Sequence, residues 1–130
     1  MGISVLLDTH VLLWALLSPE HLSSKARHLI EDSNTHLIVS SVSAWEIATK
    51  YRIGRLPEAT ALVQAYKKHL TTLQASELTI STEHALLAGQ FHVDHRDPFD
   101  RMLAAQSQIE GVSLVTSDHA FDAFEISTVW

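Results

Sequence analysis

Short apolar segments alternate with longer amphipathic segments along the chain. The first apolar segment, residues 3–7, is hydrophobic except for Ser4, which predicts a strand buried on both faces. After Asp8 the apolar residues continue to Leu17 in helical register, too far for one strand, so a helix is expected to follow at once. Asp8 is therefore expected at the C-terminal end of a strand, the edge where ligands usually bind in open α/β sheets.

Later segments repeat this alternation of strand and helix. Further strands are predicted at residues 37–39, 78–80, 112–115 and 126–129. Further helices are predicted from Ser23 or Ser24 to about residue 32, over residues 40–50, from about 58 to 73, after Ser81, from Asp97 to about 109, and briefly to Phe121. The histidine-rich stretch 90–97 is predicted to be a loop. The expected fold class is therefore α/β, with a parallel sheet of four or five strands and right-handed crossovers.

The bulk composition fits one globular domain covering residues 1–130. The chain is 46% hydrophobic and 18% charged, which argues against extensive disorder. It has no run of apolar residues long enough to span a membrane and no signal-peptide pattern, so we expect a cytoplasmic protein. The absence of cysteine excludes disulfides, thiolate metal sites and cysteine nucleophiles. The formal net charge of −6 argues against general electrostatic coating of nucleic acid, although a local basic patch could still bind phosphates.

Four acidic residues fall at predicted strand ends or in the first turns of the helices that follow: Asp8, Glu46, Asp100 and Asp118. All four are expected to face one edge of the sheet. Each also has a structural explanation, because Asp8 and Asp118 suit N-caps, Glu46 could close a capping box with Ser43, and a carboxylate at residue 100 favours the helix dipole. Four such residues together favour a binding site over four separate caps.

Carboxylates crowded in a partly desolvated cleft take up protons or destabilise the fold unless a cation neutralises them. All-oxygen ligation without cysteine suits Mg²⁺ or Mn²⁺. Such a metal polarises a phosphoryl oxygen and activates water near neutral pH. Hydrolysis of phosphodiester bonds is therefore the reaction that fits these residues.

Four segments resemble PIN-domain ribonucleases, specifically the VapC-type toxins of bacterial toxin–antitoxin pairs. They are residues 5–13, 40–50, 95–106 and 116–118, and the block His-Arg-Asp-Pro-Phe-Asp-Arg that begins at His95 is the most specific. The resemblance spans nearly the whole chain. It implies a PIN-like three-layer α/β/α fold and an endoribonuclease that depends on Mg²⁺ or Mn²⁺. Such enzymes are usually homodimers and are inhibited by a small antitoxin that occupies the site.

By motif position the resemblance implies an acidic quartet of Asp8, Glu46, Asp100 and Asp118, with Thr9 and Thr116 or Ser117 as hydroxyl neighbours. Asp8 and Asp100, with or without Asp118, are expected to hold a metal that activates the attacking water. Glu46 would orient or deprotonate that water, or bind a second cation. One-metal and two-metal sites both remain open.

Other polar residues carry weaker signals. Asp97 precedes a proline at the first helical position, so we interpret it as an N-cap rather than a ligand. Arg55 and Arg96 are candidate contacts for RNA phosphates. Zinc is disfavoured despite nine histidines, because no HExxH motif is present and His92 and His95 fall in a predicted loop. The three tryptophans are expected to be core or interface anchors.

Three other classes of protein are alternatives to a nuclease. A receiver-like Mg²⁺-binding signalling domain needs an adjacent acid pair after its first strand and a lysine after its last, but Asp8 is followed by Thr9 and no lysine follows Lys68. A dehalogenase-type phosphatase needs Asp-x-Asp at the first strand, and residue 10 is His. A non-catalytic α/β binding module remains open. Such a module should show neither a thermal shift with Mn²⁺ nor nuclease activity.

Overall fold

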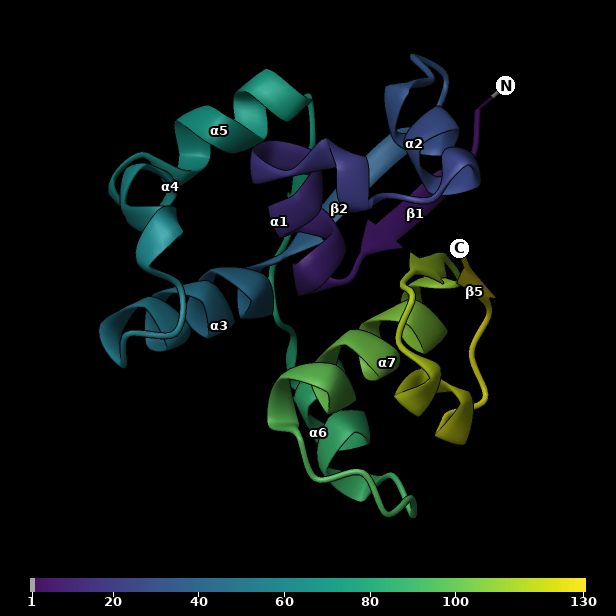
Figure 1. The fold of residues 1–130 in the computed structure, drawn as a ribbon. Coiled ribbons are helices and arrows are strands. Elements are labelled where there is room, and N and C mark those ends of the chain that lie inside the picture. Colours follow the sequence, from purple (N-terminus) through teal and green to yellow (C-terminus); the bar gives the residue numbers. More distant parts are fainter. Residues whose placement is uncertain (1) are drawn as a thin grey trace.

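The fold is built on a five-stranded, all-parallel sheet, as a computed structural model describes it for residues 2–130. The strands are β1 (Ser4–Leu7), β2 (His36–Ser40), β3 (Ser76–Leu78), β4 (Ser113–Val115) and β5 (Thr128–Val129). Their spatial order is β3-β2-β1-β4-β5, so the chain leaves β1 toward one side of the sheet and later continues on the other (Figure 1). The direction of winding therefore reverses between β1 and β4, which is where α/β sheets open a crevice for ligands.

Helices cover both faces of the sheet. They are α1 (Thr9–Leu17), α2 (Ser24–Glu31), α3 (Ser41–Arg52), α4 (Thr60–Gln64), α5 (Tyr66–Leu73), α6 (Thr82–Gln90) and α7 (Pro98–Glu110), with 3₁₀ helices η1 (Pro19–His21), η2 (Pro57–Ala59) and η3 (His119–Ala123). In Figure 1, α1, α2, α4 and α5 lie above the sheet, and α6 and α7 lie below it. This is the three-layer α/β/α arrangement that the sequence predicts. None of the helices in residues 2–130 meets the length and hydropathy that a membrane crossing requires.

The strands bury alternate side chains in two separate cores. Val5 and Leu7 of β1 and Val115 of β4 join the core beneath α1, α2, α4 and α5. Leu6 and Leu114 point the other way, into the core formed with α7 and η3. This alternation follows from the two-residue period of a strand, and it explains why β1 is apolar at every position from Val5 to Leu7.

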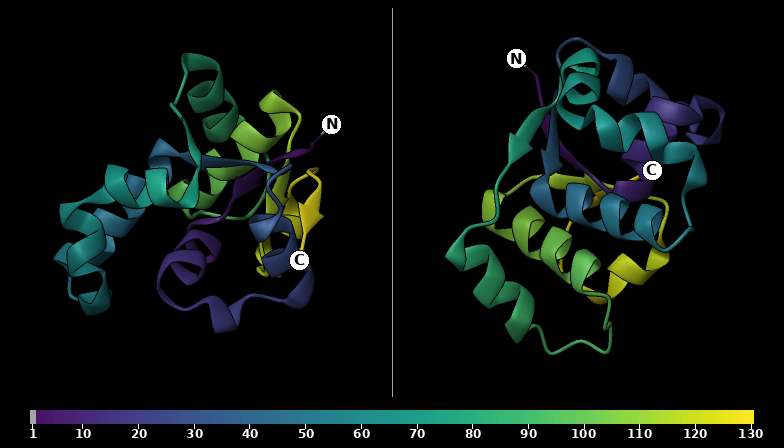
Figure 2. Two further views of the ribbon diagram at one scale, coloured as in Figure 1. Left: turned by 90° about the horizontal axis from the view of Figure 1, so that it is seen from above. Right: turned by 90° about the vertical axis from the view of Figure 1, so that its left-hand side faces the viewer.

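Helix α3 lies across the end of the sheet and contributes to both cores. It begins directly after β2, where the Ser40 hydroxyl caps it by accepting a hydrogen bond from the Val42 backbone N–H at 3.0 Å. Ile47 packs into the first core and Val42 into the second. The right-hand view of Figure 2 shows α3 running beside α7. The first turns of α3, which carry Glu46, are thereby placed near the N-terminus of α7.

Two predicted elements are wrong in detail. The helix predicted over residues 58–73 is interrupted at Ala65 (φ −136°, ψ 44°), although alanine is the best helix former, so tertiary packing overrides local propensity here. The strand predicted at residues 78–80 lies at residues 76–78, where Ile38 pairs with Ser76 and Ser40 with Leu78. This edge strand is largely exposed, so hydrophobic pattern does not mark its register.

Candidate active site

Asp8 lies at the switch point between β1 and β4. Its backbone N–H donates to the Val115 carbonyl at 3.0 Å, which extends the pairing of the two strands by one residue. Asp8 occupies the N-cap position of α1 but makes no capping hydrogen bond. Its Oδ2 accepts a hydrogen bond of 2.8 Å from the Thr116 hydroxyl instead. The side chain is buried at 4% exposure, so the capping explanation for this residue is wrong.

Glu46 enters the same region from α3 and is 2% exposed. Its Oε2 accepts a hydrogen bond from Lys50 Nζ at 2.6 Å, one turn further along the helix. Its Oε1 is buried with no hydrogen-bond partner. The predicted capping box with Ser43 is wrong, because the N-cap is Ser40 and the Ser43 hydroxyl lies 2.8 Å from the Thr9 hydroxyl. A buried carboxylate oxygen is thus left available for a ligand.

Asp100 lies in the first turn of α7 and is 9% exposed. Its Oδ2 is hydrogen-bonded to His95 Nε2 at 2.9 Å. Asp97 is the N-cap of the helix, as predicted, and accepts hydrogen bonds from the backbone N–H groups of Phe99 at 2.9 Å and Asp100 at 3.4 Å. Of the two acids in this block, Asp97 therefore holds the helix and leaves Asp100 with the more buried side chain.

The carboxyl groups of these three elements influence one another electrostatically. Burial raises the pKa of Asp8 above its ordinary value, a shift that the Thr116 hydrogen bond opposes and the charge of Glu46 increases. Burial also raises the pKa of Asp100, to about 7, although its hydrogen bond with His95 opposes the shift. Neighbouring negative charges, including Asp8 and Glu46, add to this rise. The site disfavours its own charged state in the absence of a cation.

Asp118 sits at the margin of this group. Its backbone N–H donates to the Thr116 hydroxyl at 3.0 Å, which ties it to the hydroxyl that holds Asp8. Its carboxylate, however, is exposed and caps η3 by accepting a hydrogen bond from the Ala120 N–H at 2.9 Å. The structural explanation is therefore correct for Asp118, and the structure brings three of the four predicted acids into one electrostatic group.

The donor set fits a hard divalent cation. Within residues 2–130, no three histidine or acidic side chains are already close enough to form a complete metal site. Glu46 nevertheless has an oxygen without a partner, and the pKa values of Asp8 and Asp100 are raised. Both features are expected of a cation site without its cation, because a bound cation would pair with the oxygen and lower the pKa values. Their oxygen-only chemistry suits Mg²⁺ or Mn²⁺ better than zinc.

The PIN domain family model matches residues 5–126 of the chain. This is a PIN-domain protein. It is 30% identical over 118 residues to Ribonuclease VapC22 of Mycobacterium tuberculosis, covering 88% of this chain and 87% of that relative. Ribonuclease VapC16 of the same organism is 28% identical over 61 residues, which cover 47% of this chain and 43% of the relative. The predicted family and its VapC type are confirmed.

Two solved structures share the fold of this PIN domain at low sequence identity. VapBC2 from Rickettsia felis, bound to a DNA fragment from their promoter, has a TM-score of 0.66 at 15% identity and covers 98% of both chains. FitAcB from Neisseria gonorrhoeae has a TM-score of 0.63 at 17% identity, covering 97% of this chain and 96% of that one. The predicted PIN-like α/β/α fold is confirmed.

The remaining predicted site residues of the PIN domain lie in different surroundings. Thr9 and Thr116 are buried; the Thr116 hydroxyl donates to Asp8, whereas the Thr9 hydroxyl pairs with that of Ser43. Ser117 is exposed beside them. Arg96 is exposed in the loop just before α7. Arg55 follows the far end of α3, away from the sheet edge that carries the acids.

Arg101 has a supporting role that its position beside the acidic block does not reveal. Its guanidinium donates to the backbone carbonyls of Ala88 at 2.8 Å, Phe91 at 2.7 Å and His95 at 2.9 Å, with a longer contact to Val93 at 3.4 Å. These hydrogen bonds fix the loop that carries His95. Arg101 therefore holds the loop in place and is not free to bind phosphate.

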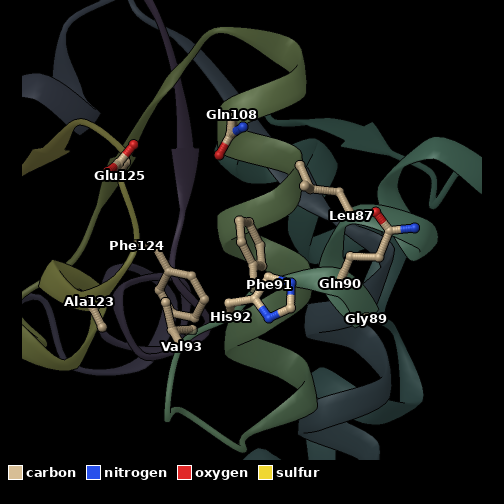
Figure 3. A pocket seen from close by; sticks show the side chains of 10 residues that line it. All are labelled: Leu87, Gly89, Gln90, Phe91, His92, Val93, Gln108, Ala123, Phe124 and Glu125. Atoms are coloured by element: carbon tan, nitrogen blue, oxygen red, sulfur yellow. The ribbon is translucent and has the colours of Figure 1, made fainter.

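The loop also borders a hollow of about 670 Å³ between α6, α7 and η3 (Figure 3). Phe91 and Phe124, whose rings meet edge to face with centroids 4.9 Å apart, lie against it. Gln90, Gln108 and Glu125 supply polar side chains at its rim. None of the residues predicted from the sequence to form the site lines this hollow, so the candidate active site is the acidic group at the switch point.

Proposed function

We propose that this PIN domain is a metal-dependent endoribonuclease, the toxin of a toxin–antitoxin pair. The observation that carries the proposal is the convergence of Asp8, Glu46 and Asp100, from three separate elements, at the switch point of a fold shared with a relative named as a ribonuclease. Residues 1–130 would act as one domain, and a toxin acting on cellular RNA would work in the cytoplasm.

The residues present fit Mg²⁺ or Mn²⁺. Asp8, Asp100 and the unpartnered oxygen of Glu46 would hold the ion, with Asp118 able to join from the margin. When bound, such an ion polarises a phosphoryl oxygen and lowers the pKa of water. Asp8 and Asp100 would then stay ionised at neutral pH, because an opposite charge counteracts the effect of their burial.

Neighbouring side chains orient the acids for metal binding and catalysis. The Thr116 hydroxyl orients Asp8, and His95 orients Asp100. Lys50 occupies one oxygen of Glu46 and leaves the other free to orient or deprotonate the attacking water, or to bind a second cation. Arg96 and Ser117 are exposed nearby and are candidate contacts for the RNA backbone, whereas Arg55 is a more distant candidate.

Three partners follow from this function. RNA is the substrate. A cognate antitoxin is the second, as the resemblance to VapC-type toxins implies, and the similar folds include that of VapBC2. A second copy of the chain is the third, as expected for this type of toxin. Co-expression with the adjacent open reading frame tests the antitoxin, and light scattering of the purified protein tests the dimer.

The deciding experiment incubates purified protein with structured and unstructured RNAs in Mn²⁺, Mg²⁺ or EDTA, beside the Asp8→Asn variant. We expect internal cleavage with either ion, none with EDTA and none with the variant. Equal cleavage by both proteins would indicate a contaminating nuclease and remove the assignment. A protein with no cleavage and no thermal shift in Mn²⁺ would instead be the non-catalytic α/β binding module.

A further inference from the structure

An exposed tryptophan stands directly beside the acidic group. Trp45 precedes Glu46 on α3, and Phe99 precedes Asp100 on α7. Their rings meet edge to face, with centroids 4.9 Å apart and planes at 82°. We call this pair the aromatic ledge. It joins the two helices at the point where each contributes an acid to the site.

Trp45 is much less buried than a tryptophan usually is. The residue is 59% exposed, whereas Trp14 and Trp130 pack against each other with ring centroids 5.8 Å apart. Of the two roles expected for Trp45, a core anchor is therefore wrong, and an interface anchor stays a prediction. Contact with the edge of Phe99 fixes the ring orientation while leaving much of its surface in water.

Charge offers RNA little attraction at this site. The chain has a formal net charge of −6, and the site itself is a group of carboxyls. The nearest lysine on α3, Lys50, is paired with Glu46 at 2.6 Å. Apart from the candidate contact with Arg96, a polyanion approaching these acids must gain its binding from a source other than positive charge. Stacking of a base on an aromatic ring is such a source, and it tolerates any base.

We propose that Trp45, fixed by Phe99, is a stacking platform for an unpaired base next to the scissile phosphate. The proposal rests on the ribonuclease function and assigns a substrate-binding residue to it. The ledge joins α3 and α7 where they carry Glu46 and Asp100, so a base on Trp45 would place its own nucleotide beside that site. A base inside a duplex has both faces covered, so the ledge selects single-stranded RNA.

Binding is tested without cleavage, in EDTA, by the fluorescence anisotropy of a labelled, unstructured oligoribonucleotide. Stacking on one ring predicts that Trp45→Ala weakens binding about 10- to 100-fold. Trp45→Phe should recover most of this loss, and Phe99→Leu should cause a smaller one. Leu86→Ala is the matched control, because Leu86 is 58% exposed on α6 and belongs to neither the ledge nor the acidic group. Fully paired RNA should bind weakly and be indifferent to Trp45→Ala.

Cleavage in Mn²⁺ then separates the ledge from the proposed function. For the ledge, Trp45→Ala should raise KM and leave kcat within a few-fold of the parental value. A protein that binds RNA through Trp45 but never cleaves it would overturn the ribonuclease proposal and keep the ledge. Parental protein that fails to bind, or equal binding by parental and Trp45→Ala proteins, would overturn the ledge. Loss of binding together with a lower mass in light scattering would instead assign Trp45 to an interface between copies, which also overturns it.

Discussion

The hydroxyl of Thr116 donates a 2.8 Å hydrogen bond to the carboxylate of Asp8, across 108 positions of sequence. Both residues directly follow strands that pair in parallel, so the end of β4 delivers the hydroxyl to the end of β1. The same hydroxyl accepts the backbone N–H of Asp118 at 3.0 Å. One buried threonine thus links the two strands at the switch point and sets the orientation of the central acid.

Replacing Thr116 by valine keeps the shape and removes this hydroxyl. The Asp8 carboxylate then loses its donor and the Asp118 N–H loses its acceptor, which should cost about 1–3 kcal/mol of the free energy of unfolding. Cleavage should fall about tenfold, because the Asp8 carboxylate loses the group that orients it, and its pH profile should move to higher pH, because loss of that hydrogen bond raises the pKa of Asp8. Urea unfolding and the pH profile of cleavage measure both effects. Thr116→Ser is the control, and a valine variant as active as the serine variant would contradict the role given to the hydroxyl.

The raised pKa of Asp100 predicts how stability depends on pH without metal. The folded protein holds a proton on this carboxyl up to about pH 7, whereas the unfolded chain releases it near the ordinary value of 3.8. The stabilisation that this proton provides is therefore lost as pH rises through about 7. Asp100→Asn removes the titrating group, so the free energy of unfolding of this variant should rise relative to that of the parental protein between about pH 4 and pH 7, by at most about 4 kcal/mol.

Urea unfolding in EDTA across this range measures the difference. Asp122→Asn provides the control, because Asp122 is exposed and its carboxylate pairs only with His119 among the described residues. A stability difference between Asp100→Asn and parental protein that does not change with pH would show that Asp100 ionises as freely as an exposed carboxyl.

The ion pairs of Lys50 and Lys67 should differ in their effects on stability. Lys50 is the only hydrogen-bond partner of the buried Glu46 carboxylate among the described residues, so Lys50→Met should destabilise the protein by about 1–3 kcal/mol. Lys67→Met breaks an exposed pair with Glu77 at 3.6 Å and should change stability by less than about 0.5 kcal/mol. Thermal and urea unfolding compare the two variants. Equal effects would mean that the Glu46 pair is not buried in solution.

Arg101 and Arg96 flank the same acid and should nevertheless respond differently. Arg101→Lys keeps the positive charge but cannot reproduce hydrogen bonds to several loop carbonyls, so we expect lower stability, faster proteolysis of the 91–97 loop and about tenfold less cleavage. Arg96→Lys should leave stability and activity close to parental. Full activity of Arg101→Lys would instead indicate that Arg101 contacts phosphate as a simple positive charge.

Much of the fold follows from local signals in the sequence. The caps Ser23, Ser81 and Asp97 start their helices as predicted, because a cap depends on atoms within three residues. The break at Ala65 and the register of β3 depend on packing with distant elements. The residues next to Ala65 and β3 carry no strong signal for the helix break or the strand register, so these two features could not be predicted from the sequence.

In the acidic group, too, local features could be predicted and those that depend on distant residues could not. The sequence treats Asp8 and Asp118 alike, as acids that follow strands, yet Asp118 caps a helix and Asp8 does not. The difference comes from Thr116, which no short-range pattern connects with Asp8. The pairing of Glu46 with Lys50 lies within reach of the i,i+4 rule and could have been predicted. The exposure of Trp45 could not, because an isolated tryptophan in a helix is usually buried.

Titration with Mn²⁺ tests the central claim most directly, because it asks whether Asp8, Glu46 and Asp100 form one cation site. Isothermal calorimetry at about pH 8 should show Mn²⁺ binding to the parental protein, weakened at least about tenfold in each of Asp8→Asn, Glu46→Gln and Asp100→Asn. Asp122→Asn should bind like the parental protein. Unchanged Mn²⁺ affinity in all three site variants, each shown to be folded, would contradict the account.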